Sequence, residues 1–254
     1  MSVLLDVQDV TMHFGGVHAL TDVSFQVQDG EFLCLIGPNG AGKTTMLKAI
    51  VGALNPQKAR IQLDGREISG LPTHRRIRLG LALTHQIVRP FRSMTLTDNV
   101  ALAVGHRRIR RVWTALGGVD RHRERAEALK LLEMVGIHNH AEQEVTGQPL
   151  GVLKRLEVAR ALALKPRLLL LDEPLAGLNH VEAARLADTI VRINQEGLTT
   201  VMIEHNLGEV LRVGHRLVVL DNGRKIAEGL PRDVMQMPNV RAAYVGKEAN
   251  DAAA

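Results

Sequence analysis

The sequence predicts an α/β protein that combines a parallel sheet with an antiparallel flank. Two apolar runs have no polar interruption: residues 32–36, which lead into a Gly-rich loop and a helix, and residues 168–171, which end in acidic residues. Such runs are typical of a parallel sheet covered on both faces. Three turn dipeptides join strand-like segments and predict type I′ hairpins, and therefore the antiparallel flank: Asp29-Gly30, Asp64-Gly65 and Asn222-Gly223.

Further strands lie before and after these runs. Val23, Phe25 and Val27 alternate with more polar residues, so they are expected to share one face of a strand. Residues 201–203 and 217–220 are apolar and short, and we expect each of them to form another strand.

The segment between about Arg89 and Lys165 has no strand signal and its pattern is helical. An all-helical insert in an α/β core is the simplest interpretation. We expect a core with its β subdomain at residues 1–88 and 162–240, a helical subdomain at residues 89–161, and a C-terminal tail at residues 241–254. Within the insert, apolar residues recur at helical spacing before a glycine stop: Ala126, Leu129, Leu132, Val135 and then Gly136.

Composition excludes several classes of protein. With 254 residues, 45% of them hydrophobic and 23% charged, the chain has the balance of an ordinary globular protein. The single cysteine, Cys34, lies in an apolar run, so we expect a buried thiol, no internal disulfide and a reducing compartment. No export signal opens the sequence and no apolar stretch approaches about 18 residues, so we expect neither export nor a membrane span.

The charge balance is basic, with a net charge of +5 and a pI near 9.7. Aromatic residues make up 2% of the chain, too few for the stacking platforms of single-strand binders, so nucleic acid is not expected as a partner. Seven arginines gather in the helical insert. They are Arg107, Arg108, Arg110, Arg111, Arg121, Arg123 and Arg125. We interpret them as a solvated face, with contact to anionic lipid headgroups as the alternative.

A Gly-rich loop at residues 37–45, GPNGAGKTT, matches the P-loop pattern GxxxxGK[ST] between a strand and a helix expected at residues 46–51. Its glycines allow the backbone to wrap an anion, so that N–H groups and the helix N-terminus point at phosphates. We expect Mg·ATP here, with Lys43 bridging the β- and γ-phosphates and the Thr44 hydroxyl holding Mg²⁺. The residues expected at the nucleotide are Asn39, Gly40, Ala41, Gly42, Lys43, Thr44 and Thr45.

Two carboxylates follow the apolar run at residues 168–171. Ligands bind at the carboxyl ends of strands in such sheets, which places Asp172 and Glu173 near the P-loop. Since successive strand side chains point to opposite faces, we expect two different roles. Asp172 would hold Mg²⁺ through water, and Glu173 would orient or deprotonate the water that attacks ATP. A solvated strand end is the alternative interpretation.

With these motifs in this order, the sequence resembles the nucleotide-binding subunits of ATP-binding cassette (ABC) transporters over nearly its whole length. The resemblance implies a P-loop NTPase core with an antiparallel β subdomain and an inserted helical subdomain. Gln86 stands where the Q-loop glutamine is expected, which implies contact with Mg²⁺ or the attacking water. His205 looks like the H-loop histidine that contacts the γ-phosphate, although a lone histidine is usually structural. Phe14 matches the aromatic that stacks on adenine, with a core or exposed phenylalanine as the alternative.

Finer features resemble the ATPases of branched-chain amino acid importers. Residues 174–179, PLAGLN, are similar to the D-loop that lines the dimer seam, with Asn179 where many relatives have aspartate. The FGG at residues 14–16 and the AYVG at residues 243–246 also resemble that subgroup. The resemblance implies uptake of branched-chain or hydrophobic amino acids, or similar small solutes.

One segment departs from the family pattern. The signature LSGGQ is expected before the helix that starts near Arg155, and the chain has QPLGV at residues 148–152. Pro149 replaces a serine and has no N–H to offer, and Val152 replaces a polar glutamine. Gly151 keeps a close backbone approach to a nucleotide, and the positive end of the helix dipole still points at its phosphate.

The family resemblance implies an assembly. Two ATPase subunits, alike or different, would sandwich two ATP molecules, each signature segment capping the other subunit's P-loop. Transmembrane permease subunits would receive the motion, a solute-binding protein would take part indirectly, and the chain would lie peripherally at the cytoplasmic face of the inner membrane. These partners would also choose the solute.

Two other functions are weighed against this one. The altered residues Pro149 and Val152 favour, as the alternative, a hydrolysis-poor ATP-binding regulatory subunit of a heterodimer. A non-transport member of the superfamily that acts on DNA or ribosomes is disfavoured, because the chain has one P-loop and no sustained heptads.

Overall fold

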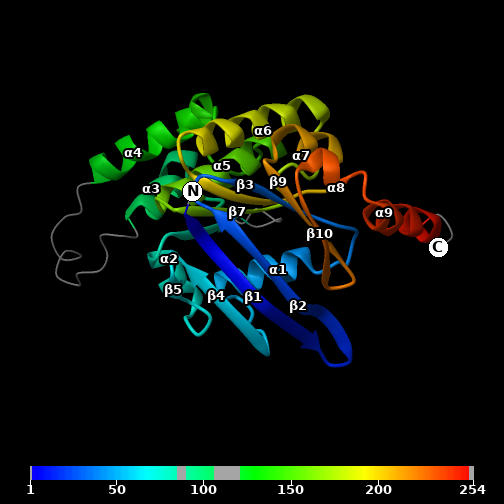
Figure 1. Cartoon of the computed structure of the whole chain (residues 1–254). Helices are drawn as coiled ribbons and strands as arrows, with labels where there is room; N and C mark the ends of the chain where they lie inside the picture. The colour runs from blue at the N-terminus through cyan, green and yellow to red at the C-terminus, as the bar shows by residue number, and fades with distance from the viewer. Residues whose placement is uncertain (1, 85–89, 106–120, 252–254) are drawn as a thin grey trace.

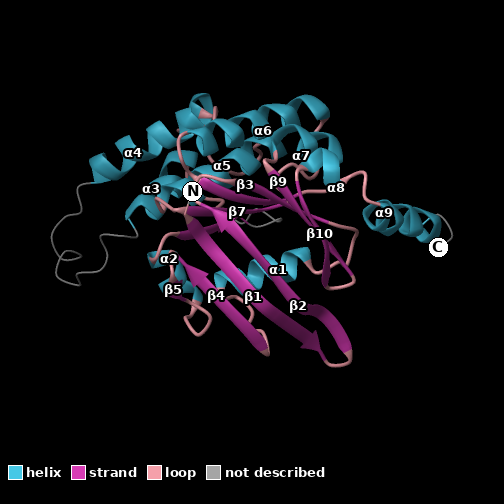
Figure 2. Cartoon of the chain, in the orientation of Figure 1, coloured by secondary structure: helices cyan, strands magenta, loops and turns pink. Residues whose placement is uncertain are grey.

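The computed structural model describes residues 2–84, 90–105 and 121–251, which form two sheets and the helices around them (Figure 1). A six-stranded sheet has the order β10-β9-β3-β8-β7-β6, and a four-stranded sheet has the order β2-β1-β4-β5. Most of the helices cover one face of the six-stranded sheet. Helix α1 (Lys43–Val51) and the four-stranded sheet lie on its other side (Figure 2). The predicted α/β fold with an antiparallel flank is confirmed.

The six-stranded sheet is parallel except at one edge. Strand β3 pairs in parallel with β8 and β9, and β7 pairs in parallel with β8 and β6, whereas β10 is antiparallel to β9. All four strands predicted from apolar runs are present. The bounds of the six strands are β3 Phe32–Ile36, β6 Leu81–Thr84, β7 Leu168–Asp172, β8 Thr199–Ile203, β9 Arg216–Asp221 and β10 Arg224–Gly229.

The central strands are apolar on both faces because each face meets a separate core. In β3, Phe32, Cys34 and Ile36 join the core beneath the helices, while Leu33 and Leu35 join the core shared with α1 and the four-stranded sheet. Each fully buried Leu or Ile stabilises the fold by about 1.5–3 kcal/mol. Burial also raises the pKa of the Cys34 thiol, which fits an inert structural cysteine.

The four-stranded sheet is antiparallel and buries one face against α1. It consists of β1 (Val3–Phe14), β2 (Val17–Gln28), β4 (Lys58–Leu63) and β5 (Arg66–Glu67). The alternation predicted in β2 is confirmed, because the three residues expected on one face are all buried in the core on this side: Val23, Phe25 and Val27.

Two of the three predicted hairpin turns are confirmed and one is wrong. Asp64-Gly65 joins β4 to β5 and Asn222-Gly223 joins β9 to β10, and all four residues have the positive φ of a type I′ turn. Asp29-Gly30 instead connects β2 to β3, which belong to different sheets. The turn dipeptide is present there, but the chain crosses from one layer to the next and forms no hairpin.

The described part of the insert contains three long helices and a short 3₁₀ segment: α3 (Leu96–Gly105), α4 (Arg121–Met134), α5 (Leu150–Ala163) and η2 (His138–His140). In the same residues, the β-type pairing consists of one isolated bridge between Thr95 and Glu144. The predicted helical character is confirmed, and the exact limits at residues 89 and 161 stay a prediction.

The predicted apolar stripe of α4 is confirmed except at its first residue. Leu132 and Val135 are buried and Leu129 packs against the same core, whereas Ala126 is exposed. Ala128 is buried in its place, so the stripe begins two residues later than predicted.

The arginine-rich surface of the insert falls mainly outside the described residues. Arg107, Arg108, Arg110 and Arg111 lie there, and so does the side chain of Arg121. Of the remaining two, Arg123 is exposed. Arg125 pairs with Asp98 of α3 and, at 2.6 Å, with Glu142, so it ties α4 to its neighbours as well as facing solvent.

The remaining helices lie beside the sheets, and α9 carries the chain out past β10 at the edge of the molecule (Figure 1). In the described part of the chain, none of the helices has the length and apolar character that a membrane crossing requires. Their bounds are α2 Thr73–Arg78, α6 His180–Gln195, α7 Leu207–Val213, α8 Pro231–Val234 and α9 Pro238–Asp251.

A fully buried arginine on α2 closes the C-terminal end of α1. Arg76 donates from Nη1 to the carbonyls of Ala49 and Ile50 at 2.7 and 2.8 Å, and these belong to the last turn of α1. It also donates to the Leu71 carbonyl at 2.7 Å and the Ser69 carbonyl at 2.6 Å. The positive charge interacts favourably with the negative end of the helix dipole, and the guanidinium N–H groups bond carbonyls that have no partner within the helix.

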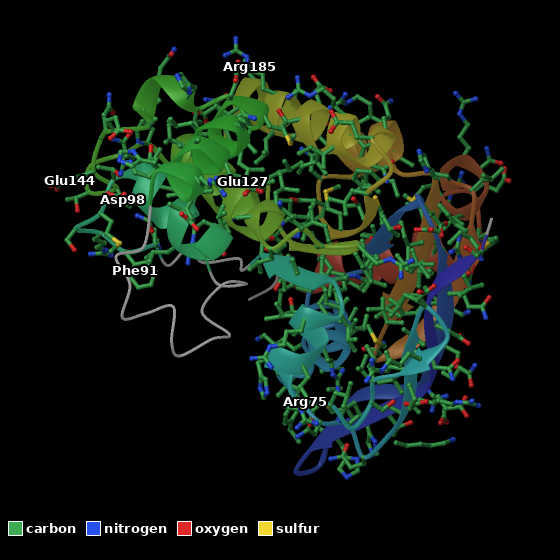
Figure 3. All side chains as sticks on the ribbon, turned by 90° about the vertical axis from the view of Figure 1, so that its left-hand side faces the viewer. Arg75, Phe91, Asp98, Glu127, Glu144 and Arg185 are labelled. Carbon is green, nitrogen blue, oxygen red and sulfur yellow. The ribbon has the colours of Figure 1, made fainter. Side chains whose placement is uncertain are left out.

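We predict that Arg76→Met lowers the free energy of unfolding by about 2–5 kcal/mol, because buried carbonyls lose their donors. Urea unfolding followed by circular dichroism measures the loss. Arg75→Met is the matched control: Arg75 lies on the same helix, is exposed and points outward (Figure 3), so a change within about 0.5 kcal/mol is expected. Equal losses in both variants would contradict the assigned role.

Candidate nucleotide-binding site

The P-loop connects the end of β3 to the start of α1, as predicted, although the helix begins at Lys43 rather than at residue 46. Gly37, Gly40 and Gly42 have φ values of 145°, 78° and 98°, which residues with a side chain rarely adopt. The loop therefore needs glycine at these positions for its backbone path alone.

Two of these glycines are also required by their neighbours. A Cβ on Gly37 would lie 2.0 Å from the Leu220 carbonyl oxygen of β9, and one on Gly42 would lie 2.5 Å from the Ala19 carbonyl oxygen of β2. The loop is thus fixed between the backbones of both sheets. Gly40 has no atom within 4 Å of its Cβ position and lies on the exposed side.

The other loop residues divide by exposure. Asn39 and Gly40 are exposed, Ala41 is buried and Thr45 is half-buried. Lys43 is buried, and its Nζ donates to the Gly37 carbonyl at 2.7 Å and to the Pro38 carbonyl at 3.0 Å. The ammonium group is therefore held inside the loop, where it can supply positive charge to an anion bound there.

Thr44 and Asp172 are brought together across 128 positions of sequence. The Thr44 hydroxyl donates to Asp172 Oδ1 at 3.1 Å, and Asp172 is buried at the end of β7. A hydroxyl and a carboxylate at this distance are hard oxygen donors of the kind that Mg²⁺ prefers, so the pair fits the predicted metal-ligating role.

Glu173 faces His205, and the strand alternation that was predicted to direct its side chain does not apply. Strand β7 ends at Asp172, and Glu173 follows in a left-handed conformation with φ of 50°, so strand alternation does not set its direction. Its N–H donates to the Ile203 carbonyl at 3.1 Å. The left-handed turn brings Glu173 Oε1 within 3.4 Å of His205 Nδ1, so the two predicted catalytic side chains are adjacent.

Neither Phe14 nor Gly151 belongs to these pairs. Phe14 ends β1 and half of its surface is exposed, which leaves its ring accessible. Gly151 lies in the first turn of α5, and its Cβ position is 3.2 Å from Glu182 Oε1 of α6. Gln86 lies outside the described residues. Asn179 caps α6 by accepting from the Glu182 N–H at 3.0 Å, within a complete capping box.

The site combines a Gly-rich loop with a buried lysine, a hydroxyl–carboxylate pair and a carboxylate–histidine pair. A family model described as ABC transporter matches residues 20–176, which is more than half of the chain. The chain belongs to the ABC transporter family. A second model, described as branched-chain amino acid ATP-binding cassette transporter, matches residues 224–250.

Several relatives match this ABC cassette over almost its whole length. It is 36% identical over 253 residues to the high-affinity branched-chain amino acid transport ATP-binding protein BraF of Pseudomonas aeruginosa, covering 96% of this chain and 98% of BraF. It is also 36% identical over 250 residues to the lipopolysaccharide export system ATP-binding protein LptB of Acidithiobacillus ferridurans, covering 98% and 99%.

A nucleotide-free ATP-binding cassette from an ABC transporter has a similar crystal structure, with a TM-score of 0.84 and 26% identity over 95% of this chain and 98% of that one. The cassette described here is therefore an ATPase subunit that binds and hydrolyses ATP and energises a membrane transporter.

Sequence reasoning missed two buried charged residues of this ATPase. Lys154 of α5 donates from Nζ to the Glu173 carbonyl at 3.0 Å, and burial lowers its pKa. Glu204 accepts from the Leu175 N–H at 2.7 Å, and burial raises its pKa. Glu204 stands next to His205 in the sequence, but a charge that is buried only by distant elements leaves no local signal.

Tyr244 of α9 reaches the P-loop from the tail. Its ring packs against the core beneath the helices, and its hydroxyl is enclosed without a hydrogen bond of ordinary geometry to the described residues. Burial raises the pKa of Tyr244 to about 12, and the nearby Gly37 amide offsets part of that rise. The tail thus packs behind the start of the loop.

We predict that the Tyr244 phenol ionises near pH 12 in the folded ATPase and near pH 10 in the chain unfolded by urea. Because the folded pKa is raised, its contribution to stability is complete below about pH 10 and is lost as the pH rises through 12. Near-ultraviolet phenolate absorbance after a rapid pH jump measures this, since the chain has a single tyrosine. Tyr244→Phe should abolish the signal, and a folded midpoint near 10 would contradict the packing.

Proposed function

We propose that this ATPase drives uptake of branched-chain or other hydrophobic amino acids. The observation that supports this proposal is the family match of the C-terminal segment. BraF and LptB are equally identical to the chain overall, but the branched-chain model matches residues 224–250, where β10, α8 and most of α9 lie. Tyr244 of that segment packs into the core of the cassette, so the tail is an integral part of the fold.

Each site residue then has a proposed role. Mg²⁺ would be held by Thr44 and, through water, by Asp172, and when bound it neutralises charge on the phosphates. Lys43 would contact the β- and γ-phosphates from within the loop. Glu173 would orient or deprotonate the attacking water, and His205 beside it would contact the γ-phosphate. Gln86 would contact the metal or the water.

A second ATPase subunit would complete the site. Helix α5 begins after Pro149 with no side-chain cap on its first N–H groups, so its positive end is available to a phosphate of the partner. Leu150 and Val181, at the starts of α5 and α6, are 43% and 59% exposed, and they supply apolar surface for contact between subunits. We further propose a peripheral position against permease subunits at the cytoplasmic face of the membrane, with a solute-binding protein as an indirect partner.

The hydrolysis-poor regulatory subunit is the weaker proposal. Among the described residues, those that would position metal and water are paired: Thr44 with Asp172, and Glu173 with His205. Pro149 and Val152 change the cap that this chain offers to a partner, and leave these pairs intact.

We predict that Glu173→Gln lowers the rate of ATP hydrolysis about 100-fold or more, because the amide cannot accept the proton of the attacking water. Phosphate release measures the rate, and size-exclusion chromatography with Mg·ATP should show an accumulated dimer. Glu196→Gln, in the loop after α6, is the exposed control and should keep the wild-type rate. Equally slow wild type and Glu173→Gln would favour the regulatory subunit instead.

The solute is tested by transport. The ATPase would be isolated together with its copurifying membrane proteins and reconstituted in lipid vesicles. ATP would be supplied on the side of the membrane that carries the ATPase. We predict ATP-dependent movement of labelled leucine that stops with Glu173→Gln. Movement of lipopolysaccharide and not of leucine would contradict the proposed solute and leave the ATPase assignment standing.

A further inference from the structure

Glu173 is held by its backbone from two directions. Its N–H donates to the Ile203 carbonyl at the end of β8, at 3.1 Å, and its carbonyl accepts from Lys154 Nζ of α5, at 3.0 Å. A non-glycine residue with a φ of 50° is strained and persists only where its surroundings fix it. The direction of the Glu173 carboxylate therefore depends on these two contacts.

Glu204 holds the chain on both sides of the same point. Its carboxylate accepts from the Leu175 N–H at 2.7 Å and from the His205 N–H at 3.3 Å. One carboxylate thus connects the loop after Glu173 with the start of the His205 segment. Glu204 is 1% exposed, so water does not compete for these hydrogen bonds.

Lys154 supplies the opposite charge within this group. It is 4% exposed, and four carboxylates attract its positive charge: Glu204, Glu173, Glu157 and Asp172. A buried ammonium is costly unless carboxylates and carbonyls surround it, which fixes its position closely. The Lys154 ammonium therefore links α5 to the ends of β7 and β8.

The first turn of α5 contacts the same segment a second time. The Cβ position of Gly177 lies 2.9 Å from Leu150 Cδ2, and the Cβ position of Gly151 lies 3.2 Å from Glu182 Oε1. Leu150 and Gly151 belong to the signature segment, one turn before Lys154 on the same helix. A displacement of the start of α5 is therefore transmitted to the chain that follows Glu173.

We propose that Lys154 and Glu204 are positioning residues that set the direction of Glu173 according to the position of the signature helix in the same chain. The inference rests on one part of the proposed function, namely that the signature segment contacts the nucleotide bound by the partner subunit. Occupancy of the partner's P-loop would then orient this chain's own Glu173, so that the two sites of the dimer are coupled through α5.

The first experiment compares three variants of the full-length ATPase. Lys154→Met removes the donor to the Glu173 carbonyl, and kcat should fall about 10- to 100-fold while KM for ATP changes less than about 3-fold. Lys154→Arg keeps a cation and should recover most of kcat. Lys165→Met, which removes an exposed lysine paired with Glu127 at 2.6 Å, is the control and should have wild-type constants.

A double variant keeps the test valid if a lone buried charge prevents folding. Lys154→Met with Glu204→Gln removes both charges, so its thermal stability should exceed that of either single variant. Its kcat should nevertheless stay about 10-fold or more below wild type, because the Glu173 carbonyl has lost its donor. Wild-type kcat in this folded double variant would overturn the proposal.

ATP-driven dimerisation separates the inference from the proposed function. Lys154→Met in the Glu173→Gln background should dimerise at an ATP concentration within about 3-fold of that for Glu173→Gln alone, since the P-loop is unchanged. If wild type hydrolyses ATP and Glu173→Gln dimerises, but Lys154→Met keeps its kcat, the positioning role is wrong and the ATPase function stands. If neither wild-type hydrolysis nor dimerisation is seen, the failure lies with the proposed function.

Discussion

The parallel register of β3, β8 and β7 is the constraint on which the site depends. Leu35 of β3 lies opposite Ile203 of β8, and Ile203 lies opposite Asp172 of β7, so the three strands end at one level. The residues that follow are therefore delivered to the same edge of the sheet: the P-loop, the Glu173 turn and the Glu204–His205 pair. A slip of one residue in any pairing would exchange the side chains that face the two cores, so the packing of each core selects this register.

The P-loop adds a second constraint, because it is packed between two sheets rather than resting on one. The Leu220 carbonyl of β9 and the Ala19 carbonyl of β2 leave room for a hydrogen atom but not for a methyl group at Gly37 and Gly42. A loop held on both sides keeps its N–H groups oriented before any ligand arrives, so little ordering cost remains for binding. Arg76 at the far end of α1 and Tyr244 behind the loop extend this support.

Sequence reasoning was most accurate where one local pattern determines the outcome. The apolar runs gave the central strands, and the P-loop pattern placed Lys43 and Thr44, because backbone path and residue type are coupled there. Asp29-Gly30 has the same turn chemistry as Asn222-Gly223, yet only the second forms a hairpin, since the choice of sheet is made by distant partners. Ala126 was predicted on the apolar face but is exposed, and strand alternation was predicted for Glu173, which is left-handed; distant packing decides both. Lys154 and Glu204 become recognisable only once α5, β7 and β8 are packed together.

The burial of the oppositely charged Lys154 and Glu204 is better explained by the single arrangement that they specify than by a gain in stability. Apolar residues of similar size often stabilise a core as well as a buried ion pair does, because two charges must first lose their water. Such residues could not, however, hold the carbonyl of Glu173 or the N–H groups of Leu175 and His205. A charge network with fixed donors and acceptors permits few arrangements, whereas an apolar contact tolerates many. Lys154 and Glu204 therefore restrict α5 and the catalytic turn to positions that they adopt together.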